Sequence, residues 1–386
     1  MPPFLRKLID HVAPMPGGNS VRVWPWTVRA FHWSLVLAVG VAALTGFLGG
    51  MSALAVHLVA GTAIPVLILL RIGIGLFGGG YARFDSFPPS KQAALEHLDD
   101  IRFGRHERHL GHNPLGALMV YAMLAVLLAI VLTGTAALAG MFKQGPFRSF
   151  IGFDAGWLIY GLHQPLAWLL MIMVAAHLWG VWFEGKRGHE NLVAAMIHGR
   201  KAAEPPAPPA PVRRAHPLLA AASGIGSVAV ATLAVYGAST GPVAGLPPAK
   251  LDPTYAEQCG ACHTPYSPVL APAAVWRQMM GDLRHHFGED ASLGDAKLHQ
   301  RILDYLVANS AEHSDTLLAH RMMRRDPSDP VRITATRFWR FMHRGIPARV
   351  FASKQVGGRS NCSACHQDAR SGRFLPENIR IPEQVE

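Results

Sequence analysis

The sequence predicts an all-α fold in which a bundle of transmembrane helices is followed by a mainly helical domain outside the membrane. Half of the 386 residues are hydrophobic and only 16% are charged, a balance that is unusual for a water-soluble protein. Five long apolar segments occupy the chain up to about residue 240. From residue 250 onward the chain is polar and carries short helical patterns.

Each apolar segment is long enough to cross the hydrocarbon core of a bilayer, which takes about 20 residues of helix. The segments lie at about 29–49, 54–78, 115–138, 157–182 and 217–239. The first follows a charged stretch and lacks a small-residue cleavage site, so we expect an uncleaved anchor rather than a signal peptide.

The positive charges of the connecting segments predict which side of the membrane each one faces. Fifteen Lys and Arg residues precede the first apolar segment or lie in the second-to-third and fourth-to-fifth loops, whereas the other two loops contain only Lys143 and Arg148. Because cytoplasmic loops collect positive charge, the N-terminus is predicted in the cytoplasm and, after five crossings, the C-terminal region outside. Most of the net charge of +11 lies in these segments, so it does not indicate nucleic-acid binding.

This layout predicts three regions. Residues 1–200 would form a four-helix membrane domain, 201–249 a linker with the fifth helix, and 250–386 the exported domain. The linker reads AEPPAPPAPV at 203–212. Such Pro/Ala-rich segments are extended and fairly stiff, so it is expected to separate the four-helix unit from the fifth helix.

The motif CxxCH occurs twice in the exported region and is the attachment signature of c-type haem. Each copy supplies two thiols for the porphyrin and one histidine for the iron: Cys259, Cys262 and His263 in the first, Cys362, Cys365 and His366 in the second. A thioredoxin-like redox pair and a zinc site are the alternatives. Two copies that use every cysteine of the chain favour haem. Their predicted export agrees, because bacterial c-type haem is attached outside the cytoplasmic membrane.

Each iron also needs a second axial ligand, normally His or Met, if it serves as a low-spin electron carrier. Spacing alone leaves nine residues open: Met279, Met280, His285, His286, His299, His313, His320, Met342 and His343.

The stretch WRQMMGDLRHHFGEDASL, followed by FMHRGIP and CSACH, resembles the bacterial dihaem cytochrome c family, and the likeness covers nearly all of 252–382. The resemblance implies two bis-His c haems and maps the distal ligands onto His286 and His343. His285 is the nearest rival of His286, because a shift of one residue turns a helical side chain by about 100°. Which distal histidine serves which haem stays open.

Four histidines lie within the predicted membrane spans, where ionisable residues are costly and usually functional. They are His32, His57, His163 and His177. His163 and His177 are 14 residues apart on one helix, which corresponds to a rise of ~21 Å and nearly the same face. His32 is expected level with His177 near the cytoplasmic surface, and His57 level with His163 near the outer surface. Two such pairs are what two stacked bis-His b haems require, with neutral imidazoles as ligands.

The segments VWPWTVRAFHW, HLVAG, RIGIGLFGG, GHNPLGALM and HENLVAAMIHGRK resemble the bacterial cytochrome b561 group, which is related to the b-type subunit of nickel–iron hydrogenases. The resemblance implies a four-helix bundle that binds two b haems through histidines of its first, second and fourth helices, and that exchanges electrons with quinone. The four membrane histidines fall on those positions. Outside the spans, His112 is expected to pack at an interface or to contact a haem propionate rather than to serve as a ligand. The histidines of the charged cytoplasmic segments are expected to be solvated: His97, His106, His109, His189 and His198.

The sequence therefore predicts a membrane-bound tetrahaem electron carrier of the bacterial inner membrane, with two non-covalent b haems and two covalent c haems. Electrons are expected to pass between membrane quinone and a soluble periplasmic redox protein, and bis-His ligation argues against catalysis at iron. Two alternatives are a quinone-linked oxidoreductase acting on a small molecule, and a membrane anchor that feeds electrons from a hydrogenase-like dehydrogenase to quinone.

Overall fold

The computed structural model describes residues 20–50, 53–105, 107–202, 215–239, 243 and 245–382. The linker predicted at 203–212 lies outside these residues. The chain divides into two compact units, Met1–Gly134 with Tyr160–Tyr236 and Thr135–Ile159 with Gly237–Glu386. The described secondary structure is mostly helical, as the composition predicts.

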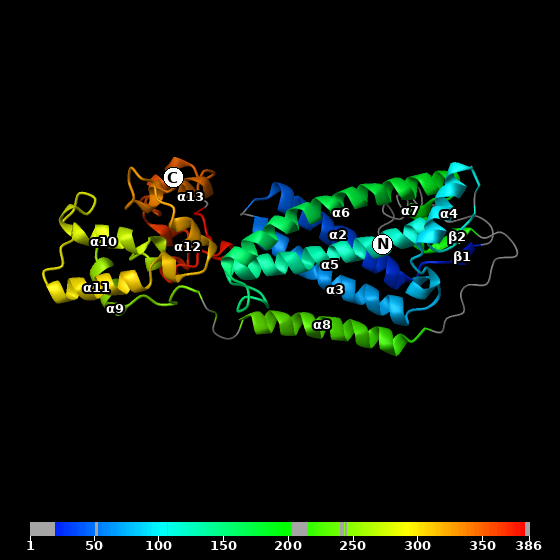
Figure 1. The fold of residues 1–386 in the computed structure, drawn as a ribbon, viewed down its shortest axis with the longest axis horizontal. Coiled ribbons are helices and arrows are strands. Elements are labelled where there is room, and N and C mark those ends of the chain that lie inside the picture. The colour runs from blue at the N-terminus through cyan, green and yellow to red at the C-terminus, as the bar shows by residue number, and fades with distance from the viewer. Residues whose placement is uncertain are drawn as a thin grey trace. The chain divides into compact units, whose positions relative to one another are not determined.

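Four long helices match the first four predicted spans and lie side by side (Figure 1). They are α2 (Trp26–Leu48), α3 (Leu54–Phe77), α5 (Pro114–Phe142) and α6 (Phe153–Arg187). Each is long and apolar enough to cross a membrane, so the chain is a multi-pass membrane protein. In α6, Asp154 stands in the first turn and Lys186 and Arg187 in the last, where their charges oppose the helix dipole.

An apolar layer fills the middle of the four-helix bundle. Ala38 of α2, Ile64 and Ile68 of α3, Leu127 of α5 and Leu170 of α6 form one buried cluster. Leu170 stands seven residues from both His163 and His177 on α6. The layer therefore lies between the level of His163 and the level of His177.

The segments that flank the bundle contain structure that was not predicted. Strand β1 (Ser20–Arg22) pairs antiparallel with β2 (Arg200–Ala202), and the short helices α4 (Lys91–Arg102) and α7 (Leu192–His198) lie in the same flanking segments. The expectation that His97 is solvated is wrong. Its side chain is 3% exposed, and its Nε2 lies 3.6 Å from Glu184 Oε1 of α6.

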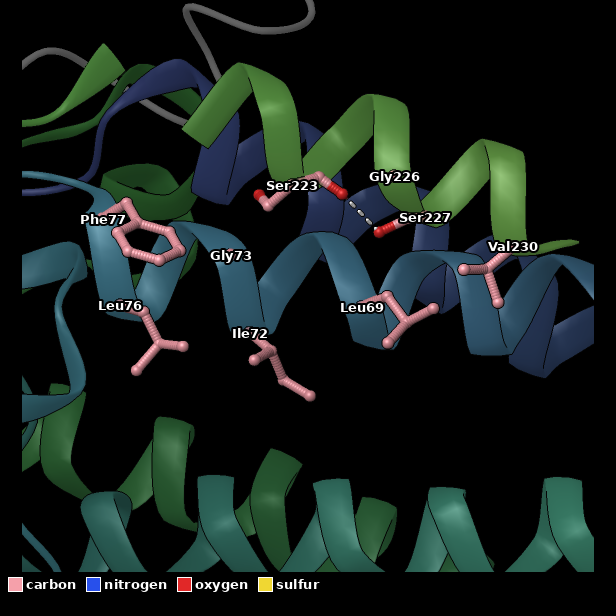
Figure 2. A pocket seen from close by; sticks show the side chains of 9 residues that line it. All are labelled: Leu69, Ile72, Gly73, Leu76, Phe77, Ser223, Gly226, Ser227 and Val230. Carbon is pink, nitrogen blue, oxygen red and sulfur yellow. Dashed lines mark hydrogen bonds between the residues drawn. The ribbon is translucent and has the colours of Figure 1, made fainter. Parts of the chain in front are cut away.

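The fifth apolar segment forms helix α8 (Pro217–Ser239), which packs along α3 (Figure 2). Gly73 of α3 permits this close approach, since a Cβ there would lie 1.9 Å from Ser223 Oγ. Ser227 in turn donates a hydrogen bond of 2.7 Å to the Ser223 carbonyl. The apolar part of α8, Leu218–Ala234, is shorter than the four long spans. Its crossing of the membrane remains a prediction.

The second unit is built from short helices and turns. The helices are α9 (Pro253–Cys259), α10 (Ala273–Gly281), α11 (Ala296–Ala308), α12 (Leu317–Met322), α13 (Arg337–Met342) and α14 (Ala348–Ala352). Tyr255, Trp276, Met280, Ile302 and Leu306 form its main core, where α9, α10 and α11 meet.

The segment between α5 and α6 belongs to this second unit, and Asp315 binds it. The Asp315 carboxylate accepts hydrogen bonds from the Lys143 ammonium and from the Phe153 backbone N–H, the latter at 3.0–3.1 Å. His320 stacks on the Phe153 ring, with centroids 3.8 Å apart. The Lys143 side chain is 3% exposed, so its charge depends on this carboxylate.

Candidate functional site

The eight histidines singled out in the sequence come together as four facing pairs. In the membrane bundle, the ring centroids of His57 and His163 are 6.4 Å apart, and those of His32 and His177 are also 6.4 Å apart. In the second unit, the separation is 6.2 Å between His263 and His286 and 6.0 Å between His343 and His366.

These separations fit two imidazoles that bind one iron from opposite sides. A metal–nitrogen bond of about 2 Å on each side, plus about 1 Å from each nitrogen to its ring centre, places the centroids about 6 Å apart. Face-to-face stacking of the rings would bring the centroids closer, as in the 3.8 Å stack of Phe153 and His320. Each pair is thus spaced to hold a single ion.

The His57–His163 pair joins α3 to α6, and both rings are anchored through Nδ1. His57 Nδ1 lies 2.9 Å from the Ala42 carbonyl, and His163 Nδ1 lies 3.1 Å from the Ile130 carbonyl. When Nδ1 carries the hydrogen and donates it to a carbonyl, Nε2 is free to bind metal. Both rings therefore leave Nε2 available to bind a metal.

The His32–His177 pair joins α2 to α6. Open space lies beside the helices that carry the membrane histidines, since a Cβ added at Gly40, Gly61 or Gly161 would meet nothing within 4 Å. A flat macrocycle held between two imidazoles needs such room along the helix surfaces. Two facing imidazoles with open space beside their helices suit a b-type haem.

A tight turn presents His286 to His263. His286 and Glu289 exchange both backbone hydrogen bonds, at 3.0 and 3.1 Å, and the two residues between them have positive φ: Phe287 at 53° and Gly288 at 100°. This is the geometry of a two-residue hairpin turn. Burial, followed by the charge of His263, lowers the pKa of His286 and so favours the neutral form that a ligand requires.

The His343–His366 pair brings the end of α13 against the second CxxCH motif. His343 Nδ1 lies 2.9 Å from the Trp339 carbonyl, and the two rings stack with centroids 4.3 Å apart. The His366 N–H donates to the Cys362 carbonyl at 2.8 Å, so the motif forms one compact turn. Burial lowers the pKa of both histidines. His286 thus faces His263 of the first CxxCH motif, and His343 faces His366 of the second.

Three of the other residues considered as distal ligands make contacts elsewhere. The His285 side chain is 81% exposed and bound to Asp282 at 2.7 Å. His299 Nε2 lies 2.8 Å from the Met280 carbonyl, and Met280 is part of the core. The geometry therefore favours His286 and His343.

The thiols of Cys259 and Cys362 do not have the electrostatics of a thioredoxin-like nucleophile. Burial raises the pKa of the Cys259 thiol to about 11, and burial with the nearby Cys365 raises that of Cys362 to about 11. A thioredoxin-like nucleophile requires a thiolate, which is favoured where the pKa is lowered. Covalent attachment to a porphyrin makes no such demand.

The two CxxCH motifs are linked through Tyr266. Its ring centroid lies 5.0 Å from that of His263, and its hydroxyl donates a 2.8 Å hydrogen bond to the Ser360 carbonyl, two residues before Cys362. The two candidate c-haem sites are therefore neighbours.

Three further residues lie near the membrane histidines: His112, whose role the sequence left open, and Thr45 and Thr133, which it did not single out. His112 packs between Trp24 and Phe87, with centroids 4.8 and 4.2 Å away, and burial followed by the charge of Arg71 lowers its pKa to about 3. Thr45 and Thr133, next to the Nδ1 atoms of His57 and His163, were not singled out. Both threonines occur in the repeated tripeptide LTG, a signal that could have revealed them.

Paired imidazoles in an apolar helical bundle, together with two CxxCH turns, define the class of protein: a membrane-embedded multihaem cytochrome. Two family models match the chain, prokaryotic cytochrome b561 over residues 23–199 and dihaem cytochrome c over residues 255–374. The chain combines a cytochrome b561 domain with a C-terminal dihaem cytochrome c domain, and in this C-terminal region it belongs to the dihaem cytochrome c family.

Known proteins resemble each half separately. Probable Ni/Fe-hydrogenase B-type cytochrome subunits from Rhizobium leguminosarum bv. viciae and Rhodobacter capsulatus are each 23% identical over 47% of this chain, which covers 89% and 82% of those proteins. A dihaem cytochrome c from Rhodobacter sphaeroides is 38% identical over 31% of this chain and 94% of its own length, with a TM-score of 0.28. A dihaem cytochrome c from Shewanella baltica OS155 is 33% identical over 34% of this chain and 94% of its own length, also with a TM-score of 0.28.

Proposed function

We propose that this protein carries electrons from membrane quinol to a soluble redox protein in the periplasm, through two b haems and two c haems. In the proposal, His57 with His163 and His32 with His177 hold the b haems, His263 with His286 and His343 with His366 the c haems. The observation that carries it is the four pairs with centroid separations of 6.0–6.4 Å. When bound, each iron accepts and releases one electron at a time.

The chain itself supplies ligation, spacing and insulation. Quinol becomes quinone by releasing two electrons and two protons, and the periplasmic acceptor takes up the electrons. The proposal assigns 1–200 to the b part, 201–249 to a linker and a fifth membrane crossing, and 250–386 to the c part. The excess of Lys and Arg in the segments predicted to be cytoplasmic supports an exported C-terminus.

Haem content tests the proposal directly. The pyridine haemochrome spectrum of the purified protein is expected to show b and c haem in equal amounts, with the c haem retained on a denaturing gel. Replacing His177 with Ala should remove the b haem that His177 would hold with His32. Covalent haem should be unchanged, because the b and c sites share no ligand. Loss of covalent haem in an inserted His177→Ala variant would contradict this layout.

A second function is favoured by the names of the relatives of the first half, which are probable hydrogenase cytochrome subunits. As an anchor of a dehydrogenase, the protein would pass electrons inward to quinone instead. Purification from mild detergent distinguishes the two functions, because a catalytic subunit present in equal amount supports the anchor function. Its absence, together with reduction of the c haems by quinol, supports the outward route.

A further inference from the structure

The tripeptide Leu-Thr-Gly occurs in two helices of the bundle, at 44–46 in α2 and at 132–134 in α5. Each copy lies against one histidine of the His57–His163 pair. The helix that follows each copy carries that histidine, α3 after α2 and α6 after α5. Each histidine of the pair therefore contacts its own copy of the tripeptide.

The first copy holds His57. The Thr45 hydroxyl donates to the Val41 carbonyl at 2.6 Å, within its own helix. The Thr45 oxygen then faces His57 Nδ1 at 3.3 Å, while the Ala42 carbonyl lies 2.9 Å from the same nitrogen. The Nδ1–H is thus shared between a carbonyl and a hydroxyl oxygen.

The second copy repeats this geometry at His163. The Thr133 hydroxyl donates to the Ala129 carbonyl at 2.7 Å. His163 Nδ1 lies 3.1 Å from the Ile130 carbonyl and 3.2 Å from the Thr133 oxygen. In both helices the carbonyl belongs to the residue three positions before the threonine, so the two arrangements correspond atom for atom.

The glycine of each copy lets the imidazole approach the helix. A Cβ at Gly46 would lie 3.0 Å from His57 Cε1, and a Cβ at Gly134 would lie 3.0 Å from His163 Cε1. Both contacts are tighter than ordinary van der Waals distance. Any larger residue would push the ring away from its Nδ1 partners.

The other membrane pair differs. The Nδ1 of His32 is buried without a hydrogen-bond partner among the described residues. A hydrogen bond donated by Nδ1–H makes an imidazole a more basic ligand. A more basic ligand stabilises oxidised iron and lowers the reduction potential, which second-shell hydrogen bonds are known to tune.

We propose that Thr45 and Thr133 are positioning residues that orient both imidazoles of the His57–His163 pair and set the potential of its haem below that of the haem at His32–His177. The inference rests on the proposed function, since it requires two b haems. The two haems then differ in potential in part through two hydroxyl groups, which lie on helices that carry neither His57 nor His163.

Redox titration of the whole protein tests this inference, with each b component resolved by its absorbance. The variants are Thr45→Val, Thr133→Val and the double variant, because Val has the shape of Thr without its hydroxyl. One b-haem potential is expected to rise, most in the double variant, while the other b haem and the c haems keep theirs. Thr45→Ser and Thr133→Ser, which keep the hydroxyl, should have the wild-type potential.

Thr62→Val provides the matched control. Thr62 is exposed on α3 and donates to the Val59 carbonyl of its own helix at 2.8 Å. This variant should leave both potentials unchanged. If Val variants lose one b haem and the Ser variants regain it, the positioning role is supported.

Two outcomes overturn the inference: both potentials stay fixed in the double variant, or both b haems shift equally. Neither outcome touches the proposed function as long as two b haems are present. A protein without b haem would instead defeat the proposed function, so the two failures are distinguishable.

Discussion

A variant in which Cys362 and Cys365 are both replaced by Ser is expected to retain one covalent haem instead of two. The thioether bonds at this site can form only from these two thiols, whereas the first motif keeps its own pair, Cys259 and Cys262. Haem staining on a denaturing gel should fall by about half per protein, and the mass of the intact chain should fall by that of one haem.

Ser363→Ala is the control for this change, because it alters the same turn without removing a thiol. It should keep both covalent haems. Full covalent haem in the double Ser variant would show that Cys362 and Cys365 are not attachment sites.

Replacing Asp315 with Ala is expected to destabilise the second unit by on the order of 3 kcal/mol, because it leaves the buried Lys143 ammonium without its counter-charge. The same change removes the acceptor of the Phe153 N–H. The loss of stability is measured by thermal unfolding in detergent, with susceptibility of the C-terminal region to proteolysis as the readout. Asp329→Ala breaks a more exposed pair, with Arg332, and should cost less than about 0.5 kcal/mol.

The Asp315 interaction also predicts a dependence on pH. Burial alone would raise the pKa of Asp315, but the hydrogen bond and charge of Lys143, with the Phe153 N–H and His320, lower it below its ordinary value. Stability from this carboxylate is therefore fully present above the ordinary Asp pKa of about 4, and is lost as the pH falls through the lowered value. The wild-type protein should lose this stability on acidification, whereas Asp315→Ala should lose correspondingly less.

The membrane spans could be predicted within a few residues because their length is set by the thickness of the bilayer. The predicted segment at 54–78, for example, corresponds to α3 at Leu54–Phe77. The levels of the membrane histidines could also be predicted, because His163 and His177 share one helix and their spacing of 14 residues fixes the distance between them along its axis. Regular periodicity carries this kind of information.

Contacts between distant segments could not be predicted in this way. The burial of His97 depends on Glu184, 87 residues away, and strand β1 has its partner at the opposite end of the b561 region. The approach of His286 to His263 requires the positive φ angles of Phe287 and Gly288 in a turn that spacing does not reveal. The two LTG copies were visible, but Thr and Gly are ordinary in membrane helices, and their meaning depends on the facing histidine.

The apolar layer around Leu127 and Leu170 has a consequence for energetics. It separates two levels of α6 that are ~21 Å apart, about two thirds of a hydrocarbon core of ~30 Å. An electron that moves between these levels therefore crosses most of the membrane voltage, worth ~1.5 kcal/mol per 100 mV. For the proposed route, in the orientation that the loop charges predict, a cell interior at negative voltage would drive electrons outward toward the c haems and oppose the inward route to quinone.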